Sequence, residues 1–388
     1  MRWSPLLAWA LYLPLGAKYA LALGGAALAV QQLHRRGQLP QVLRHPGTVA
    51  LLALLAWLTL SAAWSPATGP RIASHLWTYA LPLLLPLLAS AMHPAWAHAA
   101  LRQFCLASAA VGGVFVLHHL GLPTETGVWS STVAASGNQR IATSVLLALG
   151  STLALWQCSQ EQGRRSSQCA WIIVALLAAA GLALQDRRSG MVLLPLLLAV
   201  GLLHGVPTLP RRAAALVALA LACALTWTLA DGVRQRFDEG LRELRADTSA
   251  DTVATSWGQR VRMLEITADM IAQRPWRGHG VASWVPLWRQ RVAEGTLLHE
   301  QTTPHDEYLL LAQQGGLPAL ALALAAGLAL LRAALAAGTQ GTPLLLVCTA
   351  VATTGLFNAV LRDAKFSLPL LLLAAAAAAL GDGTRRSP

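Results

Sequence analysis

Apolar runs about as long as a bilayer is thick recur along the whole 388-residue chain. A helix needs roughly 20 apolar residues to cross a hydrocarbon core about 30 Å thick. Only 12% of the residues are charged, against about 25% in ordinary soluble domains. These runs predict an all-α polytopic membrane protein with about twelve transmembrane helices. The expected spans lie near residues 5–16, 18–33, 46–64, 73–91, 98–119, 138–157, 168–184, 189–204, 212–230, 306–333, 342–360 and 364–380.

Basic residues set the expected orientation of these spans. With twelve spans, one set of basic short loops falls on one side together with both termini, and the positive-inside rule makes that side the cytoplasm. The formal net charge of +12 does not favour nucleic-acid binding, because the basic residues form no patch or basic helix. The residues that set the orientation are His34, Arg35, Arg36, Arg44, Arg164, Arg165, Arg211, Arg212, Arg332, Arg385 and Arg386.

One polar segment on the opposite side is long enough to be a small domain. Residues 231–303 hold ten of the seventeen acidic residues of the chain, and they separate the spans in 1–230 from the spans and tail in 304–388. Helical spacing of apolar residues within this segment predicts an amphipathic helix that ends before Pro275. We expect this helix to lie on the membrane surface or to cap the bundle. Its predicted apolar stripe consists of Trp257, Val261, Leu264, Ala268 and Ile271.

Two adjacent arginines, Arg187 and Arg188, stand in a very short turn between two spans on this same side, against the charge rule. One interpretation is a solvated turn in which Asp186 pairs with one arginine. The other is functional, because a guanidinium offers a planar fork for phosphate oxygens, and ionisable groups at this depth often mark a site.

A histidine precedes the long apolar run that follows the polar segment. Thr303 is expected to cap this helix, with Asp306 completing a capping box, which leaves His305 without a structural role. His305 is either a first-turn histidine or a proton acceptor held on a rigid helix end.

Two further arginines, Arg260 and Arg262, open the predicted amphipathic helix. They point to different faces, so Arg260 is the one that we expect to reach the bundle, while Arg262 is expected to be solvated. The alternative for Arg260 is an ordinary surface arginine.

Three separated motifs now stand in one order along the chain. They are Arg188-Ser-Gly, then Arg260 followed by Pro275-x-x-Gly278-x-Gly280, then His305-Asp306-x-x-Leu309 with Gly315-Gly316-Leu317. This set resembles the O-antigen ligase and polymerase superfamily over roughly residues 120–320. Asn138, in Gly137-Asn138-Gln139-Arg140-Ile141, resembles a ligase-type segment.

The resemblance implies a GT-C-like glycosyltransferase facing the periplasm from the bacterial inner membrane. It implies undecaprenyl-diphosphate-linked polysaccharide as donor and lipid A–core as acceptor, with no cofactor and no metal. His305 is then the catalytic base, and Arg188 and Arg260, with Arg187 assisting, bind the diphosphate. Asp306, Asn138 and Arg262 are secondary candidates. The polar segment and turns on this side also carry no Asp-x-Asp pair that would hold a divalent cation.

Two other functions stay open. The nearer is an O-antigen polymerase or a protein O-oligosaccharyltransferase of the same superfamily. The more distant is a transporter or flippase for a polysaccharide lipid, which would more often show paired halves with matching broken helices.

Overall fold

The computed structural model describes residues 4–122, 124, 133–185, 188–206, 208–229, 234–235, 238–239, 241–242 and 256–386. The regular elements in these residues are all helical. They are η1 (Pro5–Tyr12), α1 (Leu15–Arg35), α2 (Leu39–Arg44), α3 (Pro46–Ser61), η2 (Ala62–Trp64), α4 (Gly69–Ala80), η3 (Leu81–Leu83), α5 (Leu84–Ala91), α6 (Pro94–His119), α8 (Gly137–Gln160), α9 (Arg165–Ala183), α10 (Arg188–Gly205), α11 (Leu209–Leu229), α13 (Ser256–Gln273), α14 (Trp284–Arg289), α15 (Glu307–Ala336), η5 (Gly338–Gly341), α16 (Thr342–Gly355) and α17 (Ala364–Arg386).

Each of the twelve predicted spans coincides with a helical segment. Within the described residues, seven of these segments are long and apolar enough to cross a membrane. The chain is therefore a polytopic integral membrane protein, as the sequence predicts. The seven segments are α3 with η2, α4 through α5, α6, α8, α9, α15 and α17.

The first predicted span is not a regular α-helix. It starts as the eight-residue 3-10 helix η1 and continues through extended Leu13 and Pro14 into α1. At about 2.0 Å per residue in the 3-10 helix and about 3.3 Å in the extended part, the stretch covers roughly 23 Å. The indole of Trp9 donates to Gln103 at 3.0 Å, and the hydroxyl of Tyr12 donates to Ser108 at 2.8 Å. This segment therefore runs alongside α6.

The centre of the bundle is α8, whose side chains are mostly buried. Close helix crossings surround it. At the crossing of α6 with α9, a Cβ added to Gly112 would overlap the carbonyl of Leu177, and one added to Gly181 would overlap the backbone of Gly112. Small residues at such crossings let helix backbones approach closely in a membrane. Small residues therefore set how closely α6 and α9 approach at this crossing.

The amphipathic helix predicted in the polar segment is present as α13, and it ends before Pro275 as expected. The face that α13 buries against the rest of the protein is not the predicted apolar stripe. The buried residues are Met263, Ile266, Thr267 and Met270, whereas Leu264 is 37% exposed and Ala268 is exposed. Thr267 interrupts the apolar pattern of the true face, because its hydroxyl accepts the indole N–H of Trp284 at 3.0 Å.

The long helix α15 is broken at Gly316, where the backbone takes φ 69° and ψ −174°. Pro318 has no N–H to donate to Gln314, and the N–H of Leu317 donates instead to Pro275 at 2.7 Å. The carbonyls of Gln313 and Gln314 are thereby freed. They accept the N–H groups of His279 at 2.9 Å and Gly280 at 2.8 Å, so the kinked helix and the loop after α13 pair through their backbones.

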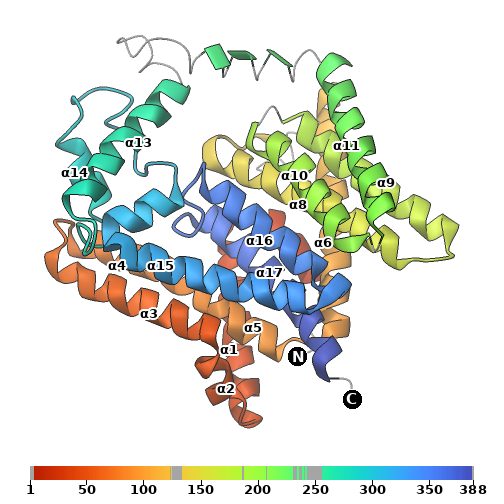
Figure 1. Cartoon of the computed structure of the whole chain (residues 1–388), viewed down its shortest axis with the longest axis horizontal. Helices are drawn as coiled ribbons and strands as arrows, with labels where there is room; N and C mark the ends of the chain where they lie inside the picture. Colours follow the sequence, from red (N-terminus) through yellow and green to blue (C-terminus); the bar gives the residue numbers. More distant parts are fainter. Residues whose placement is uncertain are drawn as a thin grey trace.

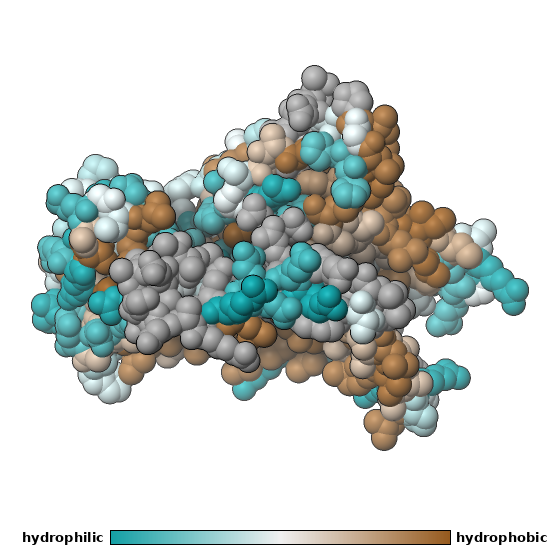
Figure 2. Space-filling view, turned by 90° about the horizontal axis from the view of Figure 1, so that it is seen from above, coloured by the Kyte–Doolittle hydropathy of each residue, from teal (hydrophilic) through white to brown (hydrophobic). Residues whose placement is uncertain are grey.

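α13 and α14 lie at one end of the molecule, beside the start of α15. The turn between α8 and α9 and the last turns of α17 lie away from that end (Figure 1). Hydrophilic residues gather over α13 and α14, at the left of Figure 2, and hydrophobic residues cover much of the surface beyond them. We call the end that carries α13, α14 and the start of α15 the site end.

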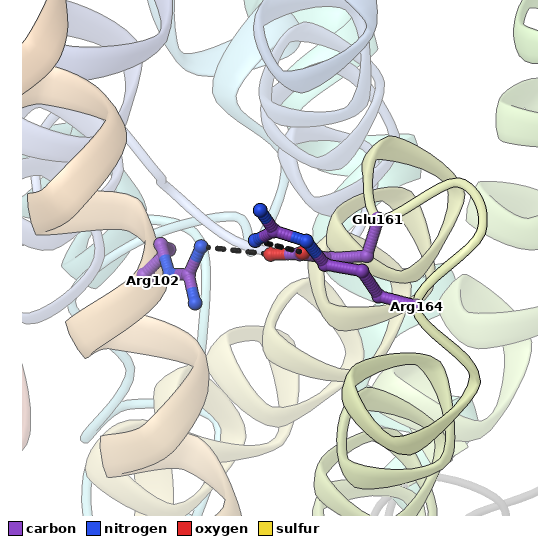
Figure 3. Close-up of polar contacts among 3 residues, drawn as sticks. All are labelled: Arg102, Glu161 and Arg164. Atoms are coloured by element: carbon purple, nitrogen blue, oxygen red, sulfur yellow. Dashed lines mark hydrogen bonds and ion pairs between the residues drawn. The ribbon is translucent and has the colours of Figure 1, made fainter.

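An ion-pair cluster closes the turn between α8 and α9, far from the site end. Arg102 lies 3.0 Å and Arg164 lies 3.7 Å from the two carboxylate oxygens of Glu161 (Figure 3). The guanidinium of Arg102 also stacks over Trp171, 5.0 Å from the ring centroid. This cluster ties α6 to the α8–α9 hairpin.

Candidate functional site

His305 does not belong to the first turn of α15. Its φ is 52°, a left-handed conformation that is unusual for a residue other than glycine and that a right-handed helix cannot include. The helix consequently begins at Glu307, and its cap is Asp306, which accepts the N–H of Leu309 at 2.8 Å. The predicted cap, Thr303, lies three residues too early and instead accepts the N–H of His305 at 3.4 Å. Strained backbone of this kind is concentrated at functional sites.

Hydrogen bonds determine which nitrogen of His305 is free. The amide nitrogen of Gln301 donates to Gln259 at 3.4 Å and to the carbonyl of Leu297 at 3.3 Å. Its oxygen therefore faces Nε2 of His305, 3.3 Å away, and Nε2 must carry the hydrogen. The lone pair is then on Nδ1, which has no hydrogen-bond partner among the described residues. Nδ1 is thus the atom that can accept a proton.

Three charged side chains act on the imidazole of His305. Burial is the largest influence on its pKa, followed by the positive charge of Arg260, and together with Arg362 these lower it from 6.5 to about 4. Asp363 opposes them. The ring is therefore neutral at physiological pH and keeps its lone pair beside two cations. The same positive charge makes the ring a weaker base, so an anion that neutralises the arginines would raise its affinity for a proton.

Arg260 stands near the start of α13, and its positive charge acts on the imidazole of His305. Its guanidinium also lies 5.9 Å from the ring centroid of Trp257, one turn earlier on the helix. Arg262 lies on another face, where it forms an exposed ion pair with Glu265 at 3.2 Å. The charge of Arg260 thus acts on His305, whereas Arg262 is exposed, and a role for either arginine in binding a diphosphate stays a prediction.

Asn138 is connected to the site by a hydrogen bond to Asp363, a residue that the sequence did not single out. Its amide donates to a carboxylate oxygen of Asp363 at 2.9 Å, and the other oxygen accepts the N–H of Lys365 at 3.0 Å. Asp363 is thus fixed on both sides, and its negative charge partly offsets the two arginines near His305. Asn138 therefore helps to fix the side chain of Asp363, and a role for Asn138 in function stays a prediction.

The arginine turn between α9 and α10 is described only in part. Arg187 lies outside the described residues, and Arg188 is the first residue of α10, with its side chain not described. A Cβ added to Gly190 would meet the Cβ of Ser144 at 2.8 Å. The start of α10 therefore packs on the same end of α8 as Asn138. The assignment of Arg187 and Arg188 to a phosphate stays a prediction.

The carboxylate of Asp306 caps α15, and burial raises the pKa of this carboxyl group. Within the described residues, no group of three or more histidine, cysteine, aspartate or glutamate side chains is placed to hold a metal ion.

Sequence reasoning missed Arg362, Asp363 and Glu307. The first two lie in the turn between α16 and α17, more than fifty residues after His305, and only the fold brings them to it. A signal was present, because a charged pair in a short turn between two apolar runs is as unusual as the Arg187–Arg188 pair.

The site is that of a polytopic membrane protein that gathers a neutral histidine, arginines and a carboxylate at one end of its bundle. Residues 172–324 match the family model described as O-antigen ligase. This match confirms the resemblance over that segment, which includes Arg187, Arg188, Arg260 and His305. Enzymes of this family transfer lipid-linked glycans. The matched segment ends before Arg362 and begins after Asn138. A comparison with curated proteins gave no match.

Proposed function

We propose that this protein is an O-antigen ligase that transfers polysaccharide from undecaprenyl diphosphate to lipid A–core. The observation that carries the proposal is Nδ1 of His305, which has no hydrogen-bond partner among the described residues, on a ring that the charges of Arg260 and Arg362 act on, within a chain whose residues 172–324 match the family. A donor that is already activated asks mainly for positioning and for neutralisation of charge. The residues gathered at the site end support both roles.

In the proposed reaction, a hydroxyl of the acceptor sugar attacks the anomeric carbon of the donor. The bond from that carbon to the diphosphate oxygen breaks, and the electron pair leaves with the diphosphate. The hydroxyl proton passes to Nδ1 of His305, and the resulting imidazolium is stabilised by Asp363. Arg188 and Arg260, with Arg187 assisting, neutralise the diphosphate. A single displacement inverts the anomeric carbon and needs neither a metal nor a nucleotide sugar.

We place the bundle in the inner membrane of a bacterium, with the site end in the periplasm. The turn between α8 and α9 and both termini then lie in the cytoplasm. This orientation follows the positive-inside rule, and both substrates are then lipid-anchored on the side that α13 and α14 face. The surrounding membrane lipids are the only other partners that the proposal requires.

Acceptor competition tests the ligase assignment against its nearest alternatives. Purified protein with labelled undecaprenyl-diphosphate-linked polysaccharide is given lipid A–core, a further lipid-linked repeat unit or a serine-containing peptide. The proposal expects product on lipid A–core only. Product on the repeat unit would make it a polymerase, and product on the peptide an oligosaccharyltransferase. Movement of labelled lipid across liposomes without a new glycosidic bond would make it a flippase.

A further inference from the structure

A buried carboxylate lies two residues after His305. Glu307 is 3% exposed, and one oxygen of its carboxylate accepts the backbone N–H groups of Leu361 at 2.8 Å and Arg362 at 3.3 Å. The other oxygen accepts the hydroxyl of Tyr79 at 3.4 Å. A buried carboxylate is expensive unless it is fully hydrogen-bonded, and here it is bonded to the turn between α16 and α17. Glu307 therefore holds the backbone of that turn against the start of α15.

A histidine of α4 holds the side chain of the same arginine. The N–H of Ala282 donates to one end of the side-chain amide of Gln314 at 2.7 Å, so that end is the oxygen. Because Nδ1 of His75 faces that oxygen at 3.4 Å, Nδ1 must carry the hydrogen. Nε2 of His75 is then bare, and it accepts Nε–H of Arg362 at 3.2 Å. This pairing requires a neutral His75.

Arg362 is thus fixed at its backbone by Glu307 and at its Nε by His75. Within the described residues its two terminal nitrogens have no hydrogen-bond partner in the protein. Its positive charge acts on His305. When the guanidinium of an arginine is held through Nε, its two terminal nitrogens can donate side by side, and this geometry matches two oxygens of a phosphate.

We propose that Glu307 and His75 are positioning residues that aim the fork of Arg362 at the diphosphate of the lipid-linked donor. This inference rests on the proposed function and deepens it. It makes the broken helix α15 the element that joins the base His305 to Arg362, since Glu307 and Gln314 both belong to the first half of that helix. A purely structural role would instead have the two residues stabilise the bundle with no specific effect on the donor.

A double-mutant cycle between His75 and Arg362 separates these roles, because residues that act through one another do not show additive effects. The readouts are the affinity of purified protein for undecaprenyl diphosphate, measured by titration, and kcat/KM for the donor in the transfer reaction. We expect Arg362→Gln to weaken both by about 10- to 100-fold, the range for a lost charge-assisted contact. His75→Ala should weaken both by about tenfold, as expected for one lost hydrogen bond to a charged group. The double variant should match Arg362→Gln alone.

Glu307→Gln keeps one oxygen for the turn and should lose less than His75→Ala, with its thermal midpoint near that of the wild type. Arg277→Gln, an exposed arginine at the same end, is the matched control and should change neither readout. The proposal is overturned if the losses at His75 and Arg362 multiply, or if His75→Ala lowers only the thermal midpoint. If the wild type binds the diphosphate yet transfers no glycan to any acceptor, the proposed function fails. The double-mutant cycle measured by binding affinity still tests whether His75 positions Arg362.

Discussion

Gly316 gives the sharpest test of the geometry that holds the site together. Its φ of 69° with ψ −174° lies in a region that is essentially restricted to glycine. A Cβ there would also overlap the carbonyl group of Trp276 and come within 2.8 Å of the carbonyl oxygen of Pro275. The backbone strain costs about 1–3 kcal/mol and the overlap about the same again, so Gly316→Ala should destabilise the fold by roughly 2–6 kcal/mol.

Gly327 in the second half of α15 is the matched control. It is helical, and no atom lies within 4 Å of its added Cβ, so Gly327→Ala should stabilise the helix by up to about 1 kcal/mol. The assay is thermal unfolding of both variants in detergent, followed by titration with undecaprenyl diphosphate. Gly316→Ala should unfold at a lower temperature than the wild type and bind more weakly, because the kink aligns Gln314 with His75. Equal midpoints for the two variants would refute the account of the kink.

Three further predictions concern the site and its surroundings. The lowered pKa of His305, about 4, keeps the base neutral at acid pH, so kcat/KM, which reports the free enzyme, should stay level from neutral pH down to near pH 5 and fall only below it. A fall of kcat/KM to half its maximum already near pH 6.5 would contradict the burial of this ring. Asn138→Ala should lower kcat/KM by about tenfold, since one hydrogen bond to a carboxylate is lost, and Asn138→Asp should lower it further by repelling Asp363; an active Asn138→Asp variant would exclude the orienting role. Glu161→Gln should change the stability by less than about 1 kcal/mol and leave transfer unchanged, because the ion pair with Arg102 is partly exposed; a loss of transfer would show that the far end is coupled to the site.

The spans and the amphipathic helix could be predicted from the sequence because apolar length and helical period are local properties. The face of α13 could not, because Thr267 looks polar in sequence and is buried through a bond to Trp284. The start of α15 was also misplaced. A threonine, a proline and an aspartate at capping spacing suggested an earlier start, and the left-handed backbone of His305 leaves no trace in the sequence.

The structure explains why glycine and proline stand at these positions of the family motifs, which the sequence alone does not. Pro275, Gly278 and Gly280 stand about forty residues before Gly316, and the structure joins them through backbone hydrogen bonds and close contacts at the kink of α15. The same holds for Arg362 and Asp363, whose closeness to His305 depends on the packing of α16 and α17 against α15. Pairing of this kind depends on tertiary structure, which single-sequence patterns do not encode.

The central claim is that His305 takes the proton of the acceptor hydroxyl in a glycosyl transfer. The direct measurement mixes purified protein with undecaprenyl-diphosphate-linked polysaccharide and lipid A–core, without ATP and with a chelator. Wild type is run beside His305→Ala and beside His119→Ala, an exposed histidine at the end of α6. We predict a ladder of glycosylated core with wild type and with the control, and a loss of at least about 100-fold with His305→Ala, the scale of general base catalysis. Full activity of His305→Ala would contradict the account.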